Sequence, residues 1–373
     1  MLYIHFPFCK QKCIYCNFYS IASLQLKEAY WGALCKEMEM KQGYLPNNHI
    51  DTLYFGGGTP SLCTIPELEK IINHLQISYP LNEGYEFTME CNPEQLTKAY
   101  LYDLKSLGIN RLSIGVQSFN DEILKLLRRC HSGAQAVEAV ENAAAVGFDN
   151  LSLDLIYDIA FRTAEMWRAD LRQALSLPIS HLSCYSLTVE ENTTLARKQA
   201  QGVLYQLDEA ETERDYAILE EMTIQAGFEQ YEISNFAKNG CISRHNSAYW
   251  NRKPYLGLGA AAHSFNGNSR KWNVADVRRY IAGINAGQPD EETENLSLVN
   301  QYDEYVLLRL RTKWGVNLSE VADSFGEKYR NHLLTGLKSV NSAYYTLQND
   351  ILTLTYTGRL FADAVAMELM AMA

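Results

Sequence analysis

Long hydrophobic runs are missing from this 373-residue sequence, and so is a start typical of secreted proteins. No stretch of 18 or more apolar residues occurs, which argues against a membrane span. The first ten residues, MLYIHFPFCK, lack a basic stretch followed by a long apolar one, so they do not resemble a signal peptide. We therefore expect a cytoplasmic protein without a transmembrane segment, for which peripheral contact with a membrane surface stays open.

Positive charge is also scarce. The 33 Lys and Arg residues face 44 Asp and Glu residues, which gives a net charge of −11, and no Lys or Arg run offsets it. Proteins held on nucleic acid mainly through phosphate charge need a basic surface. We therefore expect no nucleic-acid partner.

The cysteines are too few for a disulfide scaffold, since a chain of this size has only nine and the number is odd. Six of them stand singly, and we interpret these as small, partly buried apolar residues: Cys35, Cys63, Cys91, Cys130, Cys184 and Cys241. The other three fall within eight residues, a concentration that chance rarely gives.

Short β-type runs alternate with helical stretches over the first 230 residues. The candidate strands are residues 2–6, 51–55, 86–90, 111–116, 151–157 and 181–187. Between them, Thr97 and Asn120 are placed to cap helices and Gly147 to end one. Six strand–helix units predict a parallel sheet with right-handed crossovers, and favour a partial barrel over the closed eight-unit barrel. Ligands bind at the carboxyl ends of the strands in both folds.

We expect an α/β protein in three parts. Residues 1–230 form the six-unit partial βα barrel, and residues 231–290, dense in Tyr, Asn, Gly and His, form an irregular extension packed on it. Residues 291–373 form a small helical tail, with three helical stretches, a hairpin near 344–355 and a terminal amphipathic helix. This C-terminal α+β region resembles a winged-helix domain. The acidic segment 287–295 is interpreted as an exposed connection.

Cys9, Cys13 and Cys16 have the spacing C-x3-C-x2-C and follow the first predicted strand. Thiolates suit iron–sulfur clusters and zinc, but a closed zinc site needs four ligands, and the next cysteine lies in a helical stretch. His5 is a conceivable fourth zinc ligand. Three thiolates on a 4Fe–4S cluster leave one iron open, and this spacing resembles the signature of radical S-adenosylmethionine (SAM) proteins. In them, that iron chelates the amino and carboxylate groups of SAM.

Polar and glycine-rich positions follow the next predicted strands. Residues 56–60, GGGTP, come directly after the second strand, where glycine lets the backbone approach a ligand closely. Glu90 ends the third strand, Gln117 follows the fourth and Asp154 lies in the fifth. Such side chains need partners when buried. The carboxylates would accept hydrogen bonds from SAM, and Gln117 and Arg129 would bind its ribose and carboxylate. The alternative for each is a structural hydrogen bond.

Several motifs resemble the oxygen-independent coproporphyrinogen III oxidase superfamily. They are YIHFPFC at 3–9, GGGTPS at 56–61, ECNP at 90–93, NRLSIGVQSF at 110–119 and YEISNF at 231–236. The resemblance is strong over residues 1–285 and weaker in the tail. It implies a 4Fe–4S cluster on the three cysteines. It also implies SAM contacts from these residues: Tyr3, Tyr15, Gly57, Gly58, Thr59, Glu90, Gln117, Arg129 and Asp154.

Two features place the resemblance in the HemW-type haem-chaperone branch. The oxidases have C-x3-C-x2-C-x-C, whereas Phe18 stands at the fourth position here, and residues 245–250, HNSAYW, match the H-N-x-x-Y-W motif associated with haem. The match implies that His245 contacts haem; His5 and His263 are weaker candidates. The alternative is that His245 fixes a tight turn while Tyr249 and Trp250 fill the core.

The resemblance therefore implies a haem chaperone that delivers haem to client proteins, supported by the cluster and SAM. The alternative is oxidative decarboxylation of coproporphyrinogen III by a 5′-deoxyadenosyl radical, or another radical SAM reaction, so enzyme status stays open and no catalytic residue is assigned. The sequence departs from the family at 158–162, DIAFR, where a Gly-Leu-Pro-Gly-like turn is usual. It departs again at 257–263, which has Ala in place of Pro-Gly.

Overall fold

The structure is a computed structural model that describes residues 1–47, 49–205 and 208–372. Its central element is an open nine-stranded sheet with strand order β7-β8-β6-β5-β4-β3-β2-β1-β9. Six neighbouring strands run parallel in chain order. They are β1 (Leu2–Phe6), β2 (Ile50–Gly57), β3 (Leu81–Cys91), β4 (Arg111–Gln117), β5 (Leu151–Tyr157) and β6 (His181–Ser186). The six predicted strands and the partial barrel are confirmed.

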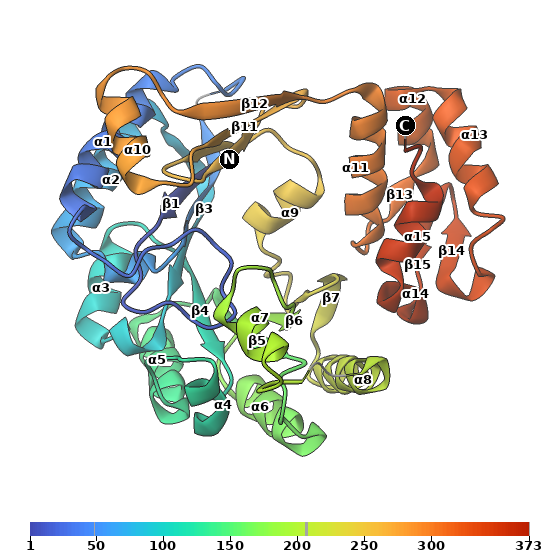
Figure 1. Cartoon of the computed structure of the whole chain (residues 1–373), viewed down its shortest axis with the longest axis horizontal. Coiled ribbons are helices and arrows are strands. Elements are labelled where there is room, and N and C mark those ends of the chain that lie inside the picture. The colour runs from blue at the N-terminus through green and yellow to red at the C-terminus, as the bar shows by residue number, and fades with distance from the viewer. Residues whose placement is uncertain (48, 206–207, 373) are drawn as a thin grey trace.

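Helices cover the outer face of this sheet (Figure 1). They are α1 (Lys27–Met40), α2 (Ile65–Ser78), α3 (Lys98–Ser106), α4 (Asp121–Leu126), α5 (Gly133–Val146), α6 (Ala164–Ser176) and α8 (Glu209–Gln225), with α7 (Thr194–Ala200) after β6. Their ends follow the predicted signals. Thr97 and Asn120 accept hydrogen bonds from backbone N–H groups of the first turns of α3 and α4. Gly147 ends α5 with a φ of +93°.

The two faces of the sheet differ in chemistry. Alternate residues such as Phe6, Phe55 and Phe87 pack under the helices in the main hydrophobic core, and the rings of Phe55 and Phe87 lie 4.8 Å apart. The residues between them are polar and bond one another across strands, as Ser113 does to Asp154. A parallel sheet buried on both faces is usually apolar throughout. The polar inner face therefore marks the interior of this partial barrel as the place for ligands.

The segment after β6 completes the sheet and fills its interior. β7 (Glu229–Glu232) and β8 (Asn235–Ala237) are antiparallel at one edge, and β9 (Leu256–Leu258) pairs with β1 at the other. Helix α9 (Arg244–Trp250) lies between the sheet and the C-terminal helices (Figure 1). The alternative in which His245 fixes a tight turn is wrong in this respect, because His245 lies in the first turn of a helix whose N-cap is Ser243.

A second, antiparallel sheet corrects the expectation of an exposed connection at 287–295. It consists of β10 (His263–Phe265), β11 (Ser269–Asn273) and β12 (Glu291–Asn295), with α10 (Val277–Asn285) packed on α1. β12 is an edge strand that is exposed over most of its length, so its sequence EETEN lacks the apolar alternation of a half-buried strand. Glu291 holds it in place through ion pairs with Lys41 and Lys271.

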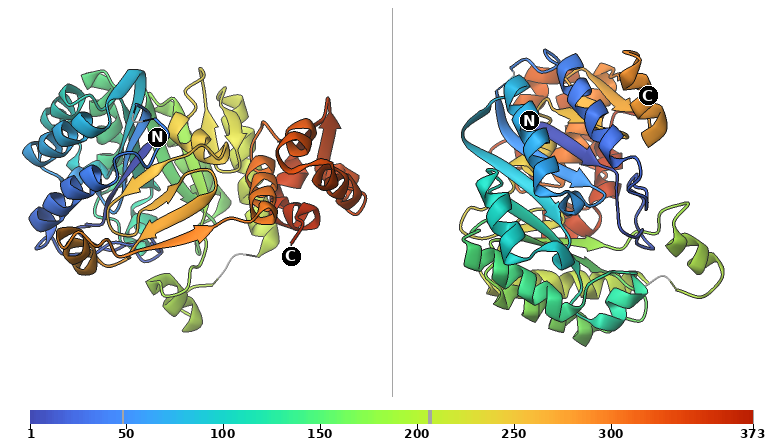
Figure 2. Two further views of the ribbon diagram at one scale, coloured as in Figure 1. Left: turned by 90° about the horizontal axis from the view of Figure 1, so that it is seen from above. Right: turned by 90° about the vertical axis from the view of Figure 1, so that its left-hand side faces the viewer.

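The C-terminal residues form a separate body beside the barrel (Figure 2). It contains α11 (Leu298–Leu310), α12 (Leu318–Phe325), α13 (Glu327–Gly336), α14 (Tyr356–Leu360) and α15 (Ala362–Leu369). Its sheet has the order β13 (Val316–Asn317), β15 (Ile351–Leu354), β14 (Tyr345–Gln348), and its core is distinct from that of the barrel. The predicted hairpin and winged-helix-like tail are confirmed. No helix among the described residues is long and apolar enough to cross a membrane.

Candidate functional site

The three cysteines lie on the loop between β1 and α1, and all are free and partly buried. The loop is closed by backbone hydrogen bonds from Cys9 to Ile21 O (3.0 Å) and from Ile21 to Pro7 O (2.8 Å). Burial raises the pKa of Cys9 and Cys16, and neighbouring cysteine side chains raise it further, which places the thiols within electrostatic reach of one another.

Two side chains from other elements contact these sulfurs. Thr59 Oγ1 donates to Cys9 Sγ (3.6 Å), and Arg129 Nη1 donates to Cys13 Sγ (3.5 Å). Hydrogen bonds to sulfur and a nearby cation stabilise thiolates and tune iron–sulfur clusters. Phe18, on the same loop, is 66% exposed.

These residues fit a 4Fe–4S cluster. Burial disfavours the free thiolates of Cys9 and Cys16, and a bound cluster would hold them deprotonated, so loading would release protons. Within the described ranges, no three His, Cys, Asp or Glu side chains are gathered to hold a metal ion. A 4Fe–4S cluster has a different requirement, because each cysteine binds its own iron at the periphery of the cluster.

The glycines after β2 are required by close contacts. Gly57 has a φ of +110°, and a Cβ added there would lie 2.5 Å from the ring of His5. A Cβ on Gly58 would lie 2.7 Å from the carbonyl oxygens of Phe6 and Phe8. Only glycine fits at either position without displacing the strand beside it.

Two partly buried carboxyl groups lie on the polar face of the sheet, and one of them, Glu90, contacts these glycines. Glu90 accepts hydrogen bonds from Tyr54 Oη (2.9 Å) and from Gly57 N (3.0 Å). Asp154 accepts from Ser113 Oγ (3.1 Å and 3.2 Å to its two oxygens). Burial raises the pKa of Glu90 to about 7 and that of Asp154 to about 6. Both are therefore suited to receive a positively charged or hydroxyl-bearing ligand.

Arg129 joins the cysteine loop to the ends of β3 and β4. Its Nη2 donates to Asn92 Oδ1 (2.7 Å) and to Gly115 O (2.6 Å), and its Nε is buried without a partner in the described part of the chain. Gln117 sits beside it at a β-bulge with a φ of +69°, a strained conformation typical of functional positions. Asn92 was not singled out from sequence, although its position directly after the third strand was a usable signal.

The two tyrosines predicted to contact SAM have different neighbours. Tyr15 is packed near Arg129 and Cys13, and its pKa is raised by burial. Tyr3 stacks on Tyr54 with ring centroids 6.0 Å apart, and its hydroxyl donates to His5 Nδ1 (3.0 Å). His5 Nε2 in turn donates to Tyr19 O (2.9 Å), so both nitrogens of His5 are engaged away from the cysteines.

Comparison with known proteins agrees with this geometry. The model of the radical SAM superfamily matches residues 3–174. The haem chaperone HemW of Bacillus subtilis is 34% identical over 368 residues, which cover 97% of each chain. The chain belongs to the HemW-type family of radical SAM proteins. HemW of Escherichia coli is 36% identical over 271 residues, or 70% of this chain and 69% of that protein. Membership of this family implies a 4Fe–4S cluster and SAM as cofactors.

A solved structure with a similar fold is also known. The structure of coproporphyrinogen III oxidase (HemN) from Escherichia coli matches with a TM-score of 0.84 and 21% identity, and covers 99% of this chain and 89% of that one. At this identity the likeness shows the fold alone. It confirms the partial radical SAM barrel and the C-terminal domain expected from the sequence.

Helix α9, which carries the segment predicted to contact haem, packs against the inner face of the barrel through His245. His245 is 1% exposed, and its ring stacks on Tyr54 with centroids 5.0 Å apart. Its Nδ1 lies 2.8 Å from Thr52 Oγ1 and its Nε2 lies 3.1 Å from Tyr249 Oη. Burial lowers the pKa of His245 to about 3, so the ring is neutral. In this arrangement both nitrogens have partners, and iron would bind His245 only after one of them moves. His263, the weaker candidate, stacks on Trp272 at 5.7 Å.

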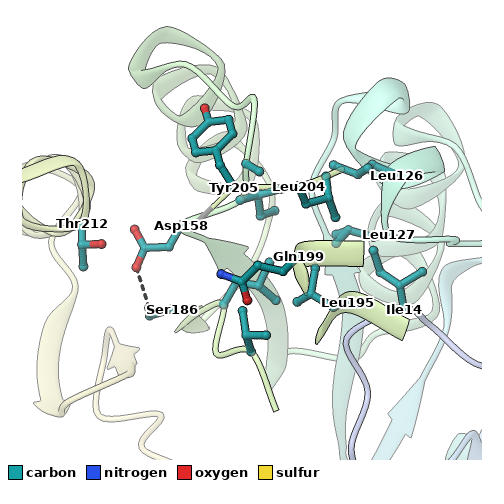
Figure 3. Close-up of a pocket in the computed structure, with 14 residues that line it drawn as sticks. Ile14, Leu126, Leu127, Asp158, Ser186, Leu195, Gln199, Leu204, Tyr205 and Thr212 are labelled. Carbon is teal, nitrogen blue, oxygen red and sulfur yellow. Dashed lines mark hydrogen bonds between the residues drawn. The ribbon is translucent and has the colours of Figure 1, made fainter. Parts of the chain in front are cut away.

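The loop that departs from the family pattern is held by a buried arginine. Arg162 donates to Ile156 O (2.7 Å), lies 4.3 Å from the ring of Trp167 and is near Asp170 and Asp215. Beside this loop is a pocket in which the Asp158 carboxylate accepts a hydrogen bond from Ser186 Oγ on one side, while Ile14 of the cysteine loop, Leu126 and Leu127 line the other (Figure 3). The loop at 158–162 and the cysteine loop therefore border the same pocket.

Proposed function

We propose that this protein is a haem chaperone, which binds haem and delivers it to haem-dependent client proteins. The observation that carries the proposal is the alignment over 97% of both chains with a protein named as a haem chaperone. Phe18 in place of a fourth cysteine and the intact H-N-x-x-Y-W segment on α9 support it. We place this activity in the cytoplasm, with haem and its acceptor proteins as partners and without nucleic acid.

In the proposed cycle, Cys9, Cys13 and Cys16 hold the 4Fe–4S cluster. The cluster supplies an open iron for SAM and the chemistry of the radical SAM family. The protein groups that would position SAM are Tyr3, Tyr15, Gly57, Gly58, Thr59, Glu90, Gln117, Arg129 and Asp154. The carboxylate of Glu90 would attract the SAM ammonium group, Gly57 and Gly58 would leave room for it, and Arg129 would neutralise its carboxylate.

We further propose His245 as a haem contact through Nε2. This role requires the Tyr249 hydroxyl to leave the ring nitrogen, because a neutral imidazole binds iron through a lone pair that a hydrogen-bond donor otherwise occupies. The low pKa of His245 favours the neutral ring that iron needs.

Two anaerobic measurements on cluster-loaded protein test the proposed function. Haem is titrated with and without SAM, and a shifted Soret band with saturable binding is the expected result. The same protein is then incubated with SAM, reductant and coproporphyrinogen III. Formation of protoporphyrinogen would identify an oxidase and contradict the chaperone assignment. Absence of haem binding, with 5′-deoxyadenosine formed in cell extracts, would instead indicate another radical SAM reaction.

A further inference from the structure

A second cavity lies where α9 meets the C-terminal domain. It has a volume of about 310 Å³, at the lower end of the range of roughly 300–1,000 Å³ typical of small-molecule sites. Trp250 and the residues after it line one side, and α11 and α12 line the other. Figure 1 shows α9 between the barrel and these two helices. We call this cavity the α9 cleft.

The α9 cleft combines aromatic surface with positive charge. Trp250, Tyr305 and Phe325 contribute rings, and Arg252 and Arg309 contribute guanidinium groups. Its nine lining residues include no His, Cys or Met. The cleft therefore suits a flat apolar ligand that carries carboxylates.

Several buried polar groups at the cleft lack partners. The indole Nε1 of Trp250 and Nε of Arg252 are buried without a hydrogen-bond acceptor in the described part of the chain, and Glu304 Oε2 is buried without a donor. Arg252 Nε and Glu304 Oε2 lie 3.9 Å apart, beyond hydrogen-bond distance. Glu304 Oε2 lies beside Arg252 Nε, whereas the buried Trp250 N–H, a kind of donor that is normally satisfied, points to an absent acceptor.

The carboxylates near Arg252 compensate its positive charge only in part. Glu304 is shared, because its other oxygen pairs with Arg270 (2.7 Å), and Glu320 accepts from Tyr305 Oη (2.7 Å). Burial lowers the pKa of Arg252 although Glu304 raises it. An incoming anion would therefore gain a charge partner in Arg252 and a free donor in the Trp250 N–H.

We propose that the α9 cleft binds the dicarboxylate edge of the porphyrin, with Arg252, Arg309 and the Trp250 N–H as the groups that recognise the carboxylates. The proposal rests on haem being the cargo, but it does not require His245 to bind iron. Because recognition is by the organic edge, the iron stays accessible to a ligand from another part of α9 or from a client protein. The C-terminal domain is then half of the binding site.

The first test uses the wild-type full chain and needs no mutation. Metal-free protoporphyrin IX, its dimethyl ester and haem are titrated under the same conditions. The diacid is expected to bind at least about tenfold more tightly than the dimethyl ester, because esterification removes both anionic groups. Equal affinity of diacid and ester would overturn the proposal, whatever the variants do.

The second test uses variants of the cleft. Trp250→Phe removes one N–H and keeps a ring, and Arg252→Gln removes one charge; each is expected to weaken diacid binding about tenfold and to leave ester binding almost unchanged. Trp272→Phe and Arg330→Gln, which lie outside the cleft, are the matched controls. Unchanged diacid binding in folded cleft variants overturns the proposal but leaves the chaperone function intact. If the wild type binds neither haem nor porphyrin, the proposed function itself fails.

Discussion

The hydroxyl of Tyr54 donates to Glu90 at 2.9 Å, while the opposite faces of its ring contact Tyr3 and His245. The Tyr54 side chain therefore connects the proposed SAM site to the proposed haem contact. Glu90 also accepts from Gly57 N, so the glycine segment, the carboxyl group and the haem motif form one connected interior network.

The pKa of Glu90 predicts a pH dependence for SAM binding. With a pKa of about 7, Glu90 is neutral at low pH and becomes a carboxylate as the pH rises through 7. The SAM ammonium group prefers the carboxylate, so affinity should rise between pH 6 and pH 8 and level off above. Anaerobic calorimetry of cluster-loaded protein measures this. In Glu90→Gln, affinity should be weaker by about tenfold, and the remaining pH dependence should shift to near pH 6, where Asp154 titrates; a slope centred near pH 7 as in the wild type would show that another group titrates.

The cysteine loop predicts a selective loss of iron. Cys9→Ser, Cys13→Ser or Cys16→Ser should each abolish the brown chromophore after anaerobic reconstitution, because a cluster needs all three thiolates. Cys130→Ser is the control, since Cys130 is exposed and was expected to play no part. The iron and sulfide contents of each variant are measured. A full cluster in any of the three cysteine-loop variants would contradict the ligand assignment.

Gly57 and Gly267 have similar backbone conformations, which allows a controlled test of the glycine segment after β2. Gly57→Ala and Gly267→Ala both place a side chain at a φ above +100°, but only the first creates a contact, with the His5 ring. Gly57→Ala should cost about 1–3 kcal/mol more in unfolding free energy and should abolish SAM binding. Thermal unfolding and SAM titration give the two values. Equal effects at both glycines would show that the contact with His5 is unimportant.

The partners of His245 predict opposite effects for two substitutions. His245→Ala should weaken haem binding and remove the shifted Soret band if the imidazole binds iron. Tyr249→Phe should strengthen binding or leave it unchanged, because it frees Nε2 without removing the ring. His263→Ala is the control. Unaltered haem affinity in His245→Ala would reject His245 as the ligand.

The buried guanidinium of Arg162 predicts a large effect on stability. Arg162→Met removes the cation beside the buried Asp170 and one of the two cations beside Asp215, which also pairs with Arg214, and breaking a buried pair costs about 3–5 kcal/mol. Arg172→Met breaks an exposed pair with Glu165, which contributes less than about 1 kcal/mol. Denaturant unfolding compares the two. A small effect at Arg162 would mean that the loop at 158–162 does not depend on this arginine for its stability.

The barrel could be predicted from sequence because its signals are local. Each parallel strand is a short apolar run, and each helix end carries its own cap, as at Thr97 and Gly147. The three cysteines and the glycines could be recognised equally well, because each motif is contained in a short continuous segment. The structure supplied the contacts that make Gly57 and Gly58 necessary.

The rest depended on partners far away in the chain. β12 is polar because it is an exposed edge strand, and β9 is only three residues long, so neither has a recognisable pattern. The surroundings of His245 are set by Thr52, 193 residues earlier. Asn92 accepts a hydrogen bond from Arg129, which lies 37 residues later in the chain. No local pattern encodes these contacts.

The most direct test of the central claim is haem transfer. Protein loaded with one equivalent of haem is mixed anaerobically with a haem-free acceptor protein, and the absorption spectrum of the acceptor is followed with time. A chaperone should pass its haem on faster than an equal concentration of free haem enters the acceptor through solution. Haem that stays on this protein, or reaches the acceptor only at the rate of free haem, would contradict the account.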